Sequence, residues 1–187
     1  QAEVVRKTSF LQGGNLVVFA PTSSGKTFVA ELAMTRQLEK MSKAIYLVPT
    51  KALAEEKYRE FERRYGHLGY RAVVATHERP ESDTLALNGR FDLLIAIYEK
   101  MRAYLTLQPD LLSQVGLVAL DEVQTLGDRE RGKVVDLVLT KIANSTYDTS
   151  FLGLSAVLGE PHLFADWLKS ELLIFSERPV ELREGIY

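Results

Sequence analysis

The chain has 187 residues, of which 46% are hydrophobic and 26% charged, with a formal net charge of -2 at pH 7. This balance is typical of a globular domain and excludes bulk electrostatic attraction to nucleic acid, so such a partner must bind a local surface. The lack of cysteine excludes disulfides and thiolate metal sites, and no apolar run approaches the ~20 residues of a membrane span. We therefore expect an intracellular protein.

Seven short apolar runs alternate with longer amphipathic segments. Most runs lack in-out alternation, which predicts strands covered on both faces, and the alternation with helices predicts a doubly wound, mainly parallel α/β sheet. The ligand of such a sheet lies at the carboxyl ends of its strands. No linker divides the chain, so residues 1–187 are expected to form one domain. The predicted strands are residues 15–20, 43–49, 70–76, 91–97, 115–121, 150–156 and 171–175, and the predicted helices are residues 2–11, 27–41, 52–65, 99–107, 131–144 and 161–170.

The first apolar run leads into "APTSSGKT" (20–27), which fits the Walker A pattern G-x-x-x-x-G-K-[ST] with Ala20 in place of the first glycine. In such a loop the backbone N–H groups surround a phosphate, Lys26 reaches the β- and γ-phosphates, and the Thr27 hydroxyl binds Mg²⁺. The alternative is a turn that caps a helix beside an exposed lysine. The residues expected to bind the nucleotide are Thr22, Ser23, Ser24, Gly25, Lys26 and Thr27.

The fifth apolar run ends in two adjacent carboxylates, Asp121 and Glu122. A phosphate-loop enzyme needs an acidic group at the end of a second strand, so we expect Asp121 to hold Mg²⁺ and Glu122 to act as general base on water. The alternative is that Asp121 caps a short helix, and both roles are compatible. With Lys26, the pair predicts a catalytic centre.

The segments "APTSSGKT", "VPTKAL", "LDEVQ" and "GLSAV" resemble, in order and spacing, motifs I, Ia, II and III of superfamily 2 (DExH-type) helicases. The resemblance covers essentially the whole chain as the first RecA-like motor domain. The short matches "ALAEEKY", "YEK", "RG" and "RPVELREG" indicate the Ski-like branch, which includes archaeal DNA-repair and exosome-associated helicases.

The resemblance implies an ATP-dependent DNA or RNA helicase or translocase that uses ATP and Mg²⁺. It also implies a partner, the second RecA-like domain of the same protein, which supplies arginine fingers worth about 10³–10⁵ in rate in related enzymes. The chain opens on Gln1 without a methionine and stops at Tyr187, about where that domain would begin. We therefore expect a fragment that is nearly inactive alone.

The resemblance also assigns roles to individual residues. Gln1 corresponds to the residue that reads adenine, and Ser155 and Ala156 belong to the motif that couples hydrolysis to strand handling. For motif Ia the alternative is that Thr50 caps a helix and Lys51 is a solvated helix residue. The segment "RERGK" (129–133) is equally compatible with a phosphate contact and with a solvated helix start. The residues expected to contact nucleic acid are Pro49, Thr50, Lys51, Glu99 and Lys100.

Four positions depart from the family pattern. Gln124 replaces the usual His or Asp of motif II, Val157 replaces the threonine of motif III, and Ile97 and His77 replace a hydroxyl residue and a glycine. In the family, these positions communicate hydrolysis or touch nucleic acid. The sequence therefore supports ATP binding and hydrolysis better than it supports strand unwinding. An amide still donates and accepts, so we expect Gln124 to couple the site to motif III.

Two other classes of protein remain open at this point. One is a non-motor nucleic-acid-binding or regulatory module with a decayed ATPase. The other is a small-molecule kinase or GTPase that shares the phosphate loop, although the GTP-specifying Asn-Lys-x-Asp stretch is absent from the sequence.

Overall fold

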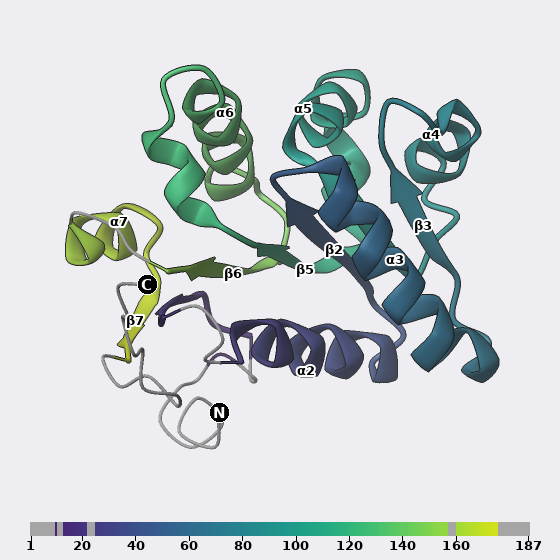
Figure 1. Ribbon diagram of the computed structural model, residues 1–187, viewed down its shortest axis with the longest axis horizontal. Helices are drawn as coiled ribbons and strands as arrows, with labels where there is room; N and C mark the ends of the chain where they lie inside the picture. The colour runs from purple at the N-terminus through teal and green to yellow at the C-terminus, as the bar shows by residue number, and fades with distance from the viewer. Residues whose placement is uncertain (1–9, 11–12, 22–24, 157–159, 176–187) are drawn as a thin grey trace, which may run out of the picture.

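Seven parallel strands form one sheet in the computed structural model, which describes residues 10, 13–21, 25–156 and 160–175 (Figure 1). The strand order is β3-β4-β2-β5-β6-β1-β7, and each hydrogen-bonded pair runs parallel. The predicted fold class is therefore confirmed. The strands are β1 (Leu16–Phe19), β2 (Lys43–Val48), β3 (Ala72–Ala75), β4 (Leu93–Ile97), β5 (Val115–Leu120), β6 (Ser150–Ser155) and β7 (Glu171–Ile174).

Helices cover both faces of this sheet, as Figure 1 shows. The helices α2 and α3 pack on one face, and α4, α5, α6 and α7 pack on the other. The α-helices are α2 (Lys26–Glu39), α3 (Lys51–Tyr65), α4 (Pro80–Leu87), α5 (Tyr98–Leu107), α6 (Gly132–Ala143) and α7 (Pro161–Trp167). Three short 3₁₀ helices complete the described chain: η2 (Gly66–Leu68), η3 (Pro109–Gln114) and η4 (Val123–Gly127).

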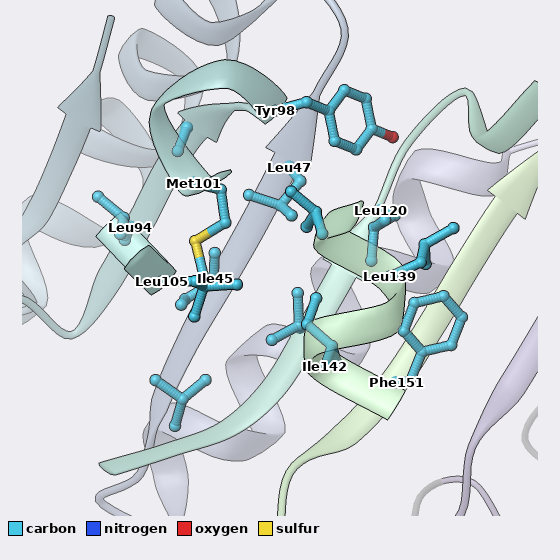
Figure 2. Packing of buried hydrophobic residues seen from close by; sticks show 14 of the residues in the cluster. Ile45, Leu47, Leu94, Tyr98, Met101, Leu105, Leu120, Leu139, Ile142 and Phe151 are labelled. Atoms are coloured by element: carbon cyan, nitrogen blue, oxygen red, sulfur yellow. The ribbon is translucent and has the colours of Figure 1, made fainter. Parts of the chain in front are cut away.

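The two faces of the sheet contribute to two separate apolar clusters. In β2, Ile45 and Leu47 pack against the helices α4 to α6, whereas Tyr46 and Val48 pack against α2 and α3. Figure 2 shows the first cluster, in which side chains of β2, α5 and α6 meet above the strands. Because both faces are buried, the strands read in the sequence as continuous apolar runs.

The predicted elements agree closely with this architecture, with one omission. All seven strands are present, and the helices predicted at 27–41, 52–65, 99–107, 131–144 and 161–170 correspond to α2, α3, α5, α6 and α7. The prediction missed α4, although Pro80 at its first turn and the acidic Glu81 and Asp83 are helix-start signals. The helix predicted at 2–11 and the segment "RPVELREG" lie almost wholly outside the described residues.

Among the described residues, no helix is long and apolar enough to cross a membrane. The expectation that residues 1–187 form a single domain remains a prediction.

Gly132 begins α6 at a point where the chain passes very close to its own backbone. The Asp128 carboxylate accepts hydrogen bonds from the N–H groups of Glu130 and Arg131, at 2.9 Å each, which folds the turn between η4 and α6. A Cβ added to Gly132 would lie 2.2 Å from the carbonyl oxygen of Leu126. Only glycine fits this approach without moving the backbone.

We therefore expect Gly132→Ala to destabilise the fold by about 1–3 kcal/mol, the usual cost of overpacking. For a chain of this size each kcal/mol lowers Tm by roughly 2–4 °C, which thermal unfolding followed by circular dichroism measures. The matched control is Gly127→Ala, because a Cβ at Gly127 meets no described atom within 4 Å. Equal Tm values for the two variants would contradict this packing.

Candidate functional site

The candidate site lies where three neighbouring strands end. β5, β6 and β1 are adjacent in the sheet, and because they are parallel their carboxyl ends lie at one edge. Asp121 follows β5, Ser155 ends β6, and the Walker A segment follows β1. The sheet topology therefore brings together motifs that are far apart in sequence.

The start of α2 provides backbone geometry suited to binding a phosphate. Gly25 precedes the helix with φ 84°, in the left-handed region that favours glycine, and no side chain of the described residues caps the helix there. An uncapped N-terminus offers its N–H groups and the positive end of the helix dipole to an anion. Thr22, Ser23, Ser24 and Gln1 lie outside the described residues.

Lys26 is folded back onto the loop that precedes it. Its Nζ donates to the carbonyl oxygens of Ala20 at 2.7 Å and Pro21 at 2.9 Å, and only 8% of the residue is exposed. Burial lowers the pKa of the Lys26 ammonium, while the charges of Glu122 and Asp121 oppose this shift. The ammonium thus lies in the field of the two carboxylates predicted to share its site.

Asp121 is buried and held in a fixed orientation. Its N–H donates to the carbonyl oxygen of Leu47 at 2.8 Å, which extends the pairing of β2 with β5. Each carboxylate oxygen accepts one hydrogen bond: Oδ2 from the Tyr46 hydroxyl at 2.6 Å and Oδ1 from the N–H of Glu122 at 3.0 Å. The helix-cap alternative for Asp121 is not realised, because the N-cap residue of η4 is Glu122 and no side chain caps this helix.

Two tyrosine hydroxyls approach Asp121 from opposite faces of the sheet. Tyr46 comes from the α2 and α3 face, and Tyr98, labelled in Figure 2, comes from the α5 face and donates to the carbonyl oxygen of Asp121 at 2.5 Å. Burial raises the pKa of both phenols well above its usual range, and the charge of Asp121 raises it further. For Tyr46, the Thr27 hydroxyl opposes the shift in pKa. Both phenols are therefore protonated donors at neutral pH.

Gln124 joins the second carboxylate to the end of β6. Its Nε2 donates to Oε2 of Glu122, and its Oε1 accepts from the Ser155 hydroxyl at 2.8 Å and the N–H of Ala156 at 3.2 Å. The amide must point this way, because a carboxylate requires a donor and an N–H requires an acceptor. One uncharged side chain thus contacts the predicted general base and both predicted coupling residues.

Glu122 itself occupies an unusual backbone conformation. Its φ of 54° and ψ of 49° lie in the left-handed region, which costs a non-glycine residue about 1–3 kcal/mol and is often found at functional sites. Burial raises the pKa of the Glu122 carboxyl, Asp121 raises it further, and Lys26 opposes them. A carboxyl with a raised pKa is suited to proton transfer.

The donors present fit Mg²⁺ better than a metal held by protein alone. Within the described residues, no group of three or more His, Cys, Asp or Glu side chains is placed to hold a metal. Mg²⁺ is commonly bound through one or two protein oxygen ligands, with water and substrate phosphates supplying the rest. The Asp121 carboxylate, which accepts a hydrogen bond from Tyr46, and the Thr27 hydroxyl are oxygen groups of the kind that Mg²⁺ uses.

Motif Ia lies at the carboxyl end of β2, where its side chains have internal partners. The Thr50 hydroxyl caps α3 by accepting from the N–H of Leu53 at 3.3 Å, which is the alternative considered for this residue. Lys51 forms an ion pair with Glu78 of the loop between β3 and α4, and the two side chains are 48% and 65% exposed. Pro49 is partly exposed beside them.

The residues of motif Ib are also paired with charges of opposite sign. Glu99 forms an ion pair with Arg131 at 3.4 Å. Lys100 binds Asp83 at 2.7 Å, and the Tyr104 hydroxyl donates to the same carboxylate at 2.5 Å. Both ion pairs are partly buried, with only 12% of the Lys100 side chain exposed, so a phosphate that binds Lys100 must displace the Asp83 carboxylate.

Two residues at this edge carry polar contacts that the sequence alone did not reveal as part of the site. Tyr46 and Tyr98 both contact Asp121, yet neither was predicted to have a role. The available signal was a tyrosine within the otherwise aliphatic run of residues 44–48, because a buried phenol requires a hydrogen-bond partner. That signal does not identify the partner.

The chain matches the DEAD/DEAH box helicase family over residues 1–163. It is 37% identical to the ATP-dependent DNA helicase Hel308 of Pyrococcus abyssi and 40% identical to that of Thermococcus kodakarensis, in both cases over 100% of this chain. A third relative, Hel308 of Methanocaldococcus jannaschii, is 35% identical over 92% of this chain. The chain spans only 25%, 16% and 15% of the lengths of these three relatives.

Proposed function

The chain belongs to the DEAD/DEAH box helicase family, and we propose that it is the ATP-binding motor domain of a longer DNA helicase or translocase. The observation that carries this proposal is the contact between Gln124 and both Glu122 and Ser155. It links the group expected to activate water with the motif expected to respond to hydrolysis. The Hel308 relatives are named as DNA helicases, which favours DNA over RNA.

ATP is proposed to bind at the start of α2. The loop N–H groups and Lys26 bind the phosphates, and the Lys26 ammonium leaves the carbonyl oxygens of Ala20 and Pro21 to do so. Carbonyl oxygens are neutral acceptors, so exchange for an anionic phosphate is favourable for the ammonium. Thr22, Ser23 and Ser24 are proposed to complete the loop, with Gln1 at the adenine.

Mg²⁺ is proposed to be held by Thr27 and Asp121, and it neutralises charge on the phosphates when bound. Glu122 then accepts a proton from the attacking water. Its carboxylate is already oriented by the Gln124 amide. A change in that amide's contacts with Ser155 and Ala156 would therefore change the orientation of the general base.

Nucleic acid is proposed to bind along the carboxyl ends of β2 and β4. Pro49, Thr50 and Lys51 line one part of this edge, and Glu99 and Lys100 line the other. The cations are partly neutralised by Glu78 and Asp83, which suits a surface that must release DNA at each step. Phosphate contacts of this type position a strand without reading its sequence.

A second RecA-like domain of the full-length protein is proposed to close the site. The relatives are several times longer than this chain, which leaves ample room for such a domain. An arginine finger from it would supply about 10³–10⁵ in rate, so this chain alone is expected to bind ATP and Mg²⁺ but to hydrolyse ATP very slowly.

The first test replaces the proposed general base. In the full-length protein, Glu122→Gln is expected to lower DNA-stimulated ATP hydrolysis by about 10²–10⁴-fold, because the amide cannot accept a proton from water. Binding of a fluorescent ATP analogue should be retained. Steady-state phosphate release and equilibrium fluorescence titration measure the two quantities.

Glu130→Gln is the matched control, since Glu130 is exposed in the following turn and its side chain has no assigned role. It should leave turnover within about twofold of wild type. If wild type and Glu122→Gln hydrolyse ATP equally slowly with and without DNA, the protein is a non-motor module with a decayed ATPase, and the proposal is wrong.

The second test concerns coupling through Gln124. We expect Gln124→Ala in the full-length protein to reduce the stimulation of ATP hydrolysis by DNA about tenfold, because it removes the contacts with Glu122, Ser155 and Ala156. ATP affinity should change little. Gln114→Ala, which removes an exposed amide contact with Lys43, is the control. Undiminished stimulation in Gln124→Ala would exclude a coupling role.

A further inference from the structure

Tyr46 places a hydroxyl group inside an apolar region. It is a residue of β2, it is 0% exposed, and its neighbours in the cluster beneath α2 and α3 include Leu16, Val18 and Leu117. A phenylalanine would supply nearly the same buried apolar surface. A buried hydroxyl without partners costs free energy, so its partners indicate why the oxygen is there.

The hydrogen-bond partner of the Tyr46 hydroxyl is a residue that the proposed function assigns to Mg²⁺. The phenol donates to Oδ2 of Asp121 at 2.6 Å. Tyr46 lies within β2 and Asp121 directly follows β5, the strand paired with β2. The bond connects two side chains that lie 75 positions apart in the sequence.

The rest of the surroundings leave Asp121 little freedom to turn. Its Oδ1 accepts from the N–H of Glu122 at 3.0 Å, and its carbonyl oxygen accepts from Tyr98 at 2.5 Å. With Oδ2 held by Tyr46, both carboxylate oxygens and the backbone are fixed. Removal of the Tyr46 hydroxyl alone would free Oδ2 and leave the other two contacts intact.

We propose that Tyr46 is a positioning residue that orients the Asp121 carboxylate for binding Mg²⁺ with the nucleotide. The inference rests on the proposed function, because it takes Asp121 as a ligand of the metal. Mg²⁺ demands near-ideal octahedral geometry, so it is sensitive to the orientation of its ligands. Groups that orient metal ligands typically contribute 10–100-fold to metal affinity.

The test uses the full-length protein with Tyr46→Phe, which removes one oxygen atom. Binding of a fluorescent ADP analogue is titrated with Mg²⁺ at equilibrium, and ATP hydrolysis with DNA is titrated in parallel. The half-saturating Mg²⁺ concentration is expected to rise about tenfold in both assays. Analogue binding in EDTA, and turnover at saturating Mg²⁺, should stay within about threefold of wild type.

The control is Tyr147→Phe, which removes another tyrosine hydroxyl that donates to an aspartate, Asp110, at 2.5 Å on a different part of the surface. It should not change the Mg²⁺ requirement. A second variant at position 46, 4-aminophenylalanine, keeps a donor at the same place and should restore the requirement to within about threefold of wild type. This variant also tests the inference if Tyr46→Phe fails to fold.

An unchanged Mg²⁺ requirement in Tyr46→Phe overturns the inference. So does a loss of turnover that is equal at all Mg²⁺ concentrations, since that result describes a packing role only. If Tyr46→Phe does not fold, a raised Mg²⁺ requirement that persists with 4-aminophenylalanine overturns it as well. Failure of the proposed function is distinguishable, because the wild-type protein itself would then show no DNA-stimulated ATP hydrolysis.

Discussion

The organisation of the site depends on how Asp121 is held at the end of β5. Hydroxyl groups from both faces of the sheet reach it, Tyr46 at the carboxylate and Tyr98 at the carbonyl oxygen. A buried carboxylate is costly unless donors surround it, so these contacts keep the acidic group in the interior. Tyr98 also begins α5, the helix that carries the proposed DNA-binding residues Glu99 and Lys100. The contacts of Asp121 thus connect the proposed ATP site to the helix that carries the proposed DNA-binding residues.

Because the sheet is parallel, few side chains are needed to connect the parts of the site. Strands β5, β6 and β1 end side by side, so Asp121, Ser155 and the start of α2 are neighbours without any long connecting loop. Gln124 then spans the remaining gap between the second carboxylate and the end of β6. An uncharged amide in this position donates on one side and accepts on the other, which a charged residue at neutral pH does less evenly. Gln124 therefore still connects Glu122 to the end of β6, although it departs from the family pattern.

Much of the fold could be predicted because strands buried on both faces leave continuous apolar runs, as in residues 44–48 and 117–120. The short helix α4 could not be predicted with the same ease, since it is only eight residues long and shows no amphipathic pattern. Lys26, Asp121 and Glu122 were recognised from motif chemistry. The role of Tyr46 was not, because its partner depends on the register that sets it opposite Ala119 of β5, and a sequence pattern does not specify that register.

The most direct measurement is a crystal structure of the full-length protein with Mg²⁺ and a non-hydrolysable ATP analogue. The account predicts that Lys26 leaves the carbonyl oxygens of Ala20 and Pro21 for the phosphates, and that Thr27 and Asp121 face the metal ion. It also predicts that Gln124 remains in contact with Glu122 or Ser155. Nucleotide bound away from the start of α2, or Lys26 still on the loop carbonyls beside a bound phosphate, would contradict the account.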